Sequence, residues 1–276
     1  MTYRKLWIQG EKELHIAGIE EAKLDAWYLL EFVTGFRRIE FFSREQEEVP
    51  QQILTSYQKQ IAKRACRIPL QQLIGSQEFM GLEFLVDENV LIPRQETELL
   101  VEQCGKFCKG KRVLDLCTGS GCIIISLKKL YEVSEAVAVD CSKEALAIAK
   151  KNGERLETLI QWLNGDLFEP VEGRFDIIVS NPPYIEHEKI HFLMPEVRDH
   201  EPVLALDGGE DGLDFYRRIL KEAKNYLVSG GYLFFEIGSN QAKAVEELFE
   251  KYDYEHIQIK KDYAGLDRII YAKSKN

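Results

Sequence analysis

The tetrapeptide Asn181-Pro182-Pro183-Tyr184 is the stretch of the sequence best suited to chemistry. It follows residues 175–180, whose near-continuous apolar side chains are typical of a parallel strand covered on both faces. Ligands of open α/β sheets bind outside the carboxyl ends of such strands. The prolines stiffen the segment, so the Asn181 side-chain oxygen and the Pro182 carbonyl form a fixed pair of acceptors. Beside the flat ring of Tyr184 they suit a planar NH2 group, although an ordinary proline-rich turn is the alternative interpretation.

A second candidate site is a glycine-containing loop, residues 117–121, between a predicted strand at 112–116 and a helix. Such a loop lets backbone N–H groups approach a ligand closely. A second predicted strand, residues 136–140, ends in an acid where dinucleotide-binding folds hold the ribose hydroxyls. The loop lacks the full Gly-x-Gly-x-x-Gly pattern, and Asp115 before it disfavours a pyrophosphate. These features favour S-adenosylmethionine, with its positive sulfonium, over NAD.

A third predicted strand, residues 159–163, ends shortly before Asp166 and Leu167. We expect Asp166 to accept a hydrogen bond from an adenine amino group and Leu167 to cover the adenine, although a core position for Leu167 is the alternative. The predicted cofactor-binding residues are Asp115, Cys117, Thr118, Gly119, Ser120, Gly121, Asp140, Asp166, Leu167 and Asn181.

These candidate sites need a scaffold, and the chain predicts one with two domains. Residues 1–75 show apolar side chains at three- and four-residue steps, which predicts a small helical bundle for partner or substrate recognition. Residues 76–92 predict a β-hairpin linker with its turn at 87–89. Residues 93–276 form the predicted catalytic domain, in which strands and helices alternate and a terminal hairpin adds an antiparallel edge strand.

Two further segments of the predicted catalytic domain bear on the site. Its first helix contains Leu99 to Val101, and Gln95 or Thr97 is the expected N-terminal cap. Residues 185–214 form a long, charged and irregular stretch, which we interpret as a cover that faces the substrate.

Composition limits the classes of function. The 276-residue chain carries a formal charge of −10, and residues 78–276 hold 25 Lys and Arg against 36 Asp and Glu, a net of −11. This acidity argues against direct nucleic-acid binding. The six cysteines lack zinc spacing, and His187 and His191 have no third ligand nearby, so we expect no metal. No apolar run is long enough to span a membrane and no signal peptide is evident, which predicts a cytoplasmic protein with no membrane partner.

With these residues in view, the sequence resembles the release factor glutamine methyltransferases, the HemK/PrmC family, over nearly its whole length. The resemblance rests on the helical N-terminal region and on several motifs: Ile92-Pro93-Arg94 with Glu96-Thr97-Glu98, the loop from Asp115 to Gly121, Asp140, Asn181 to Tyr184, and Arg198-x-x-Glu201-Pro202 leading into Gly208-Gly209-x-Asp211-Gly212-Leu213.

The resemblance implies a doubly wound, mostly parallel seven-stranded α/β sheet of the class I S-adenosylmethionine methyltransferase type. It implies methyl transfer to the side-chain nitrogen (N5) of the glutamine in the Gly-Gly-Gln loop of class I peptide-chain release factors, the protein partners in translation termination. One position departs from the family, since Cys117 stands where the loop usually has glycine. A cysteine is costly there if the loop needs a positive φ.

An amide nitrogen is a poor nucleophile, so we expect catalysis to come mainly from positioning. The Asn181 oxygen and the Pro182 carbonyl are predicted to accept from the substrate NH2, while Pro183 and Tyr184 flank the amide. Two alternatives remain: an adenine-N6 methyltransferase acting on nucleic acid, and a non-catalytic adapter that binds the cofactor and docks a protein. We expect a monomer.

Overall fold

The computed structural model describes residues 1–275, which fold as two compact units. Unit 1 comprises residues 1–76 and the segment 194–200, and unit 2 comprises residues 77–193 with the described residues from 201 onward. The domain boundaries predicted from the sequence stay predictions. No helix among residues 1–275 combines the length and the apolar composition that crossing a membrane requires.

Unit 1 is a helical bundle around an aromatic centre. Its helices are α1 (Tyr3–Ile16), α2 (Ala22–Thr34), α3 (Arg38–Arg44), α4 (Gln51–Ala65), α5 (Leu70–Ile74) and, from the distant segment, α9 (Pro195–His200). The rings of Trp7, Trp27 and Phe41 meet edge to face, with centroids 5.0 to 5.9 Å apart. Helix α2 ends at Gly35, whose φ of 73° is the left-handed conformation that glycine adopts without strain.

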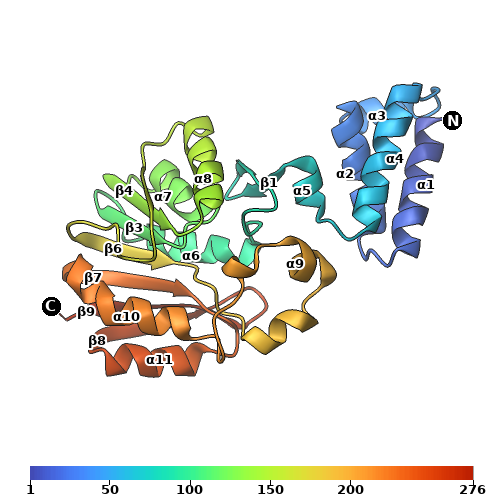
Figure 1. Ribbon diagram of the computed structural model, residues 1–276. Helices are drawn as coiled ribbons and strands as arrows, with labels where there is room; N and C mark the ends of the chain where they lie inside the picture. Colours follow the sequence, from blue (N-terminus) through green and yellow to red (C-terminus); the bar gives the residue numbers. More distant parts are fainter. Residues whose placement is uncertain (276) are drawn as a thin grey trace. The chain divides into compact units, whose positions relative to one another are not determined.

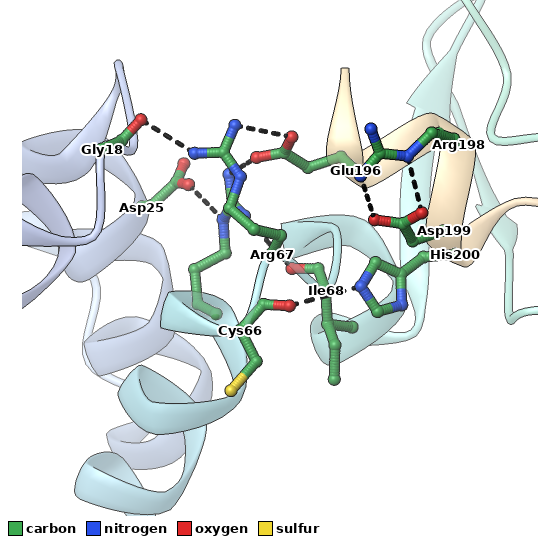
Figure 2. A network of polar contacts seen from close by, with 10 residues as sticks. Gly18, Asp25, Cys66, Arg67, Ile68, Glu196, Arg198, Asp199 and His200 are labelled. Carbon is green, nitrogen blue, oxygen red and sulfur yellow. Dashed lines mark hydrogen bonds and ion pairs between the residues drawn. The ribbon is translucent and has the colours of Figure 1, made fainter. Parts of the chain in front are cut away.

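Buried and partly buried charges hold α9 within unit 1, in a group that we call the Arg64 cluster: Asp25, Arg64, Arg67 and Glu196. Figure 2 labels Asp25, Arg67 and Glu196 of this cluster. Arg64 lies 2.7 Å from Asp25 and 3.0 Å from Glu196, and Arg67 lies 2.9 Å from the second oxygen of Glu196. Although burial alone would raise the pKa of Glu196, its backbone hydrogen bond and the two arginines lower it below the ordinary value. The cluster therefore ties the segment 194–200 to helices α2 and α4.

Unit 2 contains a hairpin and a large sheet with its covering helices. The hairpin strands are β1 (Ser76–Phe79), whose first residue still belongs to unit 1, and β2 (Leu82–Leu85). The other strands are β3 (Arg112–Leu116), β4 (Glu135–Asp140), β5 (Gln161–Asn164), β6 (Phe175–Ser180), β7 (Leu227–Glu236), β8 (Tyr254–Lys261) and β9 (Asp267–Ser274). The α-helices are α6 (Gln95–Gly105), α7 (Cys122–Leu130), α8 (Lys143–Arg155), α10 (Asp214–Tyr226) and α11 (Ala242–Lys251).

The hairpin is present, but the predicted position of its turn at 87–89 is wrong. The chain reverses at Met80 and Gly81, whose φ angles are 54° and 71°. Two successive positive φ angles match the right-handed twist of the strands. Methionine is an uncommon residue for that conformation, so the sequence carried little signal for the turn.

The seven-stranded sheet has the order β5-β4-β3-β6-β7-β9-β8, which confirms the predicted mostly parallel sheet. Strands β3 to β7 run parallel along this order. Strand β9 is antiparallel to both β7 and β8. The predicted antiparallel edge strand is therefore wrong in one respect: β9 lies one position inside the edge, which β8 forms.

Helices cover both faces of this sheet (Figure 1). Alternate residues of β3 serve different cores: Val113 packs with α6 and α7, whereas Leu114 packs with the core that contains α10 and α11. This alternation follows from the period of two along a strand. Because both faces are buried, the loops at the strand ends are where unit 2 can bind a ligand.

The stretch 185–214, predicted to be irregular, contains three short helices. These are η1 (His187–Phe192), α9 and η2 (Val203–Ala205), of which η1 and η2 are 3-10 helices. Short segments without regular secondary structure connect these helices.

Candidate active site

The carboxyl ends of β3, β4 and β6 meet at one edge of the sheet. Leu116 pairs with Val139 on one side and with Ser180 on the other. The following residues, Cys117, Asp140 and Asn181, are therefore neighbours in space. They share a cavity whose full lining is Asn89, Val90, Leu91, Cys117, Gly119, Val139, Asp140, Cys141, Ser142, Ala145, Gly165, Asp166, Leu167, Asn181, Pro183, Pro202, Leu204, Ala205 and Phe215.

The loop after β3 is held in a strained shape. Cys117 has a φ of 59°, so the position that departs from the family pattern does adopt the conformation that favours glycine. A side chain with a Cβ costs about 1–2 kcal/mol there. The Thr118 N–H donates to the Val139 carbonyl at 3.0 Å, and the Gly119 N–H donates to Asp140 at 2.8 Å. These bonds fasten the loop to β4.

Asp140 presents an anchored carboxylate to the cavity. Its two oxygens accept from the backbone N–H groups of Gly119 and Ser142, at 2.8 and 2.9 Å. Burial raises the pKa of Asp140 above its ordinary value, while these backbone hydrogen bonds oppose the shift. A fixed acceptor at the end of the second parallel strand is suited to vicinal hydroxyls.

Asp115 lies behind the loop rather than on the cavity surface. It is fully buried and accepts the Thr118 hydroxyl at 2.6 Å, while Oδ1 has no hydrogen-bond partner among the described residues. Burial raises the pKa of Asp115 to about 7, against the opposing effect of the Thr118 hydrogen bond. Its geometry supports the loop and does not bring its carboxylate to the cavity lining.

The predicted adenine-binding residues both line the cavity. Asp166 forms an ion pair with Arg218 at the cavity rim, where both side chains are about half exposed. Leu167 is buried and has a φ of 49°. An apolar side chain and a carboxylate thus stand side by side at the end of β5, as an adenine face and its amino group would require.

The tetrapeptide after β6 divides between cavity and interior. Asn181 and Pro183 line the cavity, whereas Pro182 and Tyr184 do not. The Asn181 Nδ2 group donates to the Thr97 hydroxyl at 3.3 Å, and the Tyr184 hydroxyl donates to Glu236 at 3.3 Å. Burial, followed by the Glu236 charge, raises the pKa of Tyr184 well above its ordinary value.

Thr97 is not the helix cap that the sequence suggested. Arg94 occupies the N-cap position, no side-chain capping bond is present there, and α6 begins at Gln95. Thr97 therefore lies in the first turn, buried beside Asn181. From the sequence alone, a threonine near a helix start is expected to be the N-cap, because the sequence does not show that its partner is Asn181.

Sequence reasoning missed two walls of the cavity. Asn89, Val90 and Leu91 come from the segment predicted as a linker, and Pro202, Leu204 and Ala205 come from the segment predicted as a cover. The second wall follows Glu201, whose carboxylate accepts from Arg94 at 2.5 Å. The only signal for this anchor was that both residues belong to motifs of the resembled family.

The sheet, the loop after β3 and the cavity at the strand ends define a methyltransferase-type α/β domain. The family model "Methyltransferase small domain" matches residues 94–197, and the model "PrmC N-terminal domain" matches residues 5–75. The crystal structure of a methyltransferase from Pyrococcus furiosus has the same fold, with a TM-score of 0.59 and 21% identity, over 78% of this chain and 99% of that one.

Curated relatives define the family more closely. The release factor glutamine methyltransferase of Geobacter sulfurreducens is 40% identical over 273 residues, which cover 98% of this chain and 95% of that protein. The protein of the same name from Clostridium acetobutylicum is 41% identical and covers 90% of each chain. The chain belongs to the release factor glutamine methyltransferase family, as its motifs predicted.

Proposed function

We propose that the protein transfers a methyl group from S-adenosylmethionine to the side-chain amide nitrogen of the glutamine in the Gly-Gly-Gln loop of class I release factors. The relatives' names support a release factor as substrate. The observation that carries the chemistry is the position of Asn181, which lines the cavity beside the loop after β3 while its Nδ2 group is engaged by Thr97.

The donors and acceptors around the cavity fit S-adenosylmethionine. Asp140 offers carboxylate oxygens to the ribose hydroxyls, and Asp166 with Leu167 suits the adenine. The acidic surroundings, with Asp115 behind the loop, favour a cationic ligand over a phosphate. When bound, this cofactor supplies a methyl group on a positively charged sulfur.

The protein's own contribution is to orient the substrate amide. The Asn181 oxygen and the Pro182 carbonyl are proposed to accept the two hydrogens of the substrate NH2 group, which aligns its nitrogen with the methyl carbon. As the new nitrogen–carbon bond forms and the carbon–sulfur bond breaks, the nitrogen becomes positive until it releases a proton. Fixed acceptors at that point stabilise the developing charge.

Incubation with labelled S-adenosylmethionine and a release factor tests the proposal, with a release factor whose loop glutamine is alanine as the negative substrate. Asn181→Ala should lower kcat by about 100-fold or more, because a preorganised polar contact in the transition state is lost. Cofactor binding should change little. Near-normal turnover by Asn181→Ala would refute the role of Asn181. Equal labelling of the alanine factor, or labelling of DNA or RNA instead, would refute the substrate.

A further inference from the structure

Two buried side chains and one partly buried side chain stand behind Asn181, and we call them the orienting network: Thr97 and Glu236, which are buried, and Tyr184. Thr97 comes from the first turn of α6, Tyr184 follows the site tetrapeptide, and Glu236 ends β7. Thr97 is 3% exposed and Glu236 2% exposed. Neither Thr97 nor Glu236 lines the cavity, so any effect that they have on a bound substrate passes through another residue.

The Glu236 carboxylate determines the direction of the hydrogen bonds in the orienting network, because an ionised carboxylate can only accept. The Tyr184 hydroxyl donates to Glu236 Oε1 at 3.3 Å. The other oxygen, Oε2, has no hydrogen bond of ordinary length among residues 1–275. Burial raises the pKa of Glu236, and the side chains of Thr97, Arg268 and Tyr184 oppose that shift. The Thr97 hydroxyl is thus one of the neighbours that favour the charged form of Glu236, and a hydroxyl beside a carboxylate is most stable with its proton turned towards the negative charge.

A hydroxyl whose proton faces Glu236 can only accept from its other neighbours. The neighbour on the cavity side is Asn181, whose Nδ2 group donates to Thr97 Oγ1 at 3.3 Å. The two ends of a carboxamide differ chemically but hardly in shape, so packing alone does not select one orientation. The hydroxyl makes the selection, because it pairs with the NH2 end and turns Oδ1 away from Thr97.

We propose that Thr97 and Glu236 are positioning residues that fix the orientation of the Asn181 carboxamide, so that an acceptor rather than a donor faces the substrate amide. This inference rests on the proposed role of Asn181. With the carboxamide reversed, the Asn181 NH2 group would face the substrate NH2 group, and two donors would oppose each other. In this inference the negative charge on the unpaired Glu236 oxygen attracts the Thr97 hydroxyl proton. That role gives a function to an oxygen that is costly to bury without a partner.

The test replaces the Thr97 hydroxyl without changing the shape of the side chain. Thr97→Val should lower kcat for release factor methylation by about 10- to 100-fold, because a misdirected group costs alignment in the transition state. The KM for the release factor and the Kd for S-adenosylmethionine should stay within about two-fold, since neither residue lines the cavity. Thr97→Ser, which keeps the hydroxyl, should recover most of the rate. Thr55→Val, on the exposed face of α4, is the matched control.

A double variant separates orientation from general damage. In the Asn181→Ala background, Thr97→Val should cause no further loss, because the carboxamide that it orients is already absent. Glu236→Gln, of nearly the same shape, should lower kcat in the wild-type background and also add nothing to Asn181→Ala. If Thr97→Val does not fold, Glu236→Gln measured in the two backgrounds takes its place.

Three outcomes would overturn the inference while leaving the proposed function intact: a normal kcat for Thr97→Val beside an inactive Asn181→Ala, losses that add in the double variant, or a Thr97→Ser variant as slow as Thr97→Val. Normal turnover by Asn181→Ala would instead remove the proposed role of Asn181 and this inference with it.

Discussion

The two units of the protein treat carboxylates that have little contact with solvent in different ways. In unit 1, Asp25 and both oxygens of Glu196 meet the guanidinium groups of Arg64 and Arg67. In unit 2, three buried carboxylates each have one oxygen without a hydrogen-bond partner in the described chain: Asp115, Glu201 and Glu236. Asp115 accepts from Thr118 in the loop after β3, Glu201 directly precedes Pro202 of the cavity lining, and Glu236 accepts from Tyr184, which follows Pro183 of that lining.

This difference separates charges that hold structure together from charges that prepare a site. An ion cluster in which the carboxylates are paired fixes geometry, and its removal in part is far more harmful than its removal as a whole. A buried carboxylate with an unused oxygen keeps a raised pKa and an unbalanced field, and such groups concentrate where function requires them. Burial raises the pKa of Asp115, Glu201 and Glu236, whereas the pKa of Glu196 is lowered.

The largest expected effect breaks the paired cluster. Arg64→Met should lower the free energy of unfolding by about 3–5 kcal/mol, because it leaves the buried Asp25 without a counter-charge and Glu196 with Arg67 alone. Urea denaturation followed by tryptophan fluorescence in a Trp162→Phe background reports on unit 1, because Trp7 and Trp27 lie in its core and Trp162, the third tryptophan, lies in unit 2. Arg4→Met, which removes an exposed ion pair with Glu45, is the control and should cost at most about 1 kcal/mol. Equal losses in the two variants would contradict the distinction.

A smaller effect should appear when an unpaired acid is neutralised. The pKa of Asp115 is about 7 in the folded protein and 3.8 as its ordinary value. The folded state therefore holds this proton more tightly, so the stability it provides is present below pH 3.8 and is lost as the pH rises through 7. The loss is at most about 4 kcal/mol, at 1.36 kcal/mol per pKa unit.

Asp115→Asn should remove that part of the pH dependence and be more stable than the wild type at pH 8, while the amide oxygen still accepts from Thr118. Unfolding free energies measured from pH 4 to 8 provide the comparison, with the exposed Asp253→Asn as control. If the Asp115→Asn and wild-type curves run parallel, the buried acid carries no such linkage.

The smallest effect concerns strain in the loop beside these acids. Cys117→Gly relieves about 1–2 kcal/mol of left-handed strain but adds about 0.5–1 kcal/mol of unfolded-state entropy and loses the apolar contacts of the thiol. The free energy of unfolding should change by less than about 1 kcal/mol in thermal or urea denaturation. A loss above about 2 kcal/mol would mean that packing of the Cys117 side chain outweighs the backbone strain.

The sequence predicted features that depend on local pattern. The apolar run at 175–180 predicted β6, and the acid at 140 predicted the end of β4. The position of β9 was missed, because the order of strands in the terminal hairpin is set by pairing with β7 and not by any local signal. The hairpin turn at Met80 was missed because methionine does not indicate a positive φ.

Contacts between distant residues were beyond reach from one sequence. Arg64 and Glu196 are 132 positions apart, and Asn181 and Thr97 are 84 apart. At Cys117 the departure from the family pattern is visible in the sequence, but only the φ of 59° shows that this position adopts the conformation that favours glycine. The roles assigned to the site residues stay predictions until the variants are assayed.

The membership of the segment 194–200 in unit 1 limits how this protein can be divided. A fragment that starts after Ser76 would keep Glu196 and lose Arg64 and Arg67, so a short piece of the remaining chain would have no partners to fold against. Domain exchange with a relative at that junction would have to transplant the seven-residue segment as well. In this respect the N-terminal helices are not a detachable module.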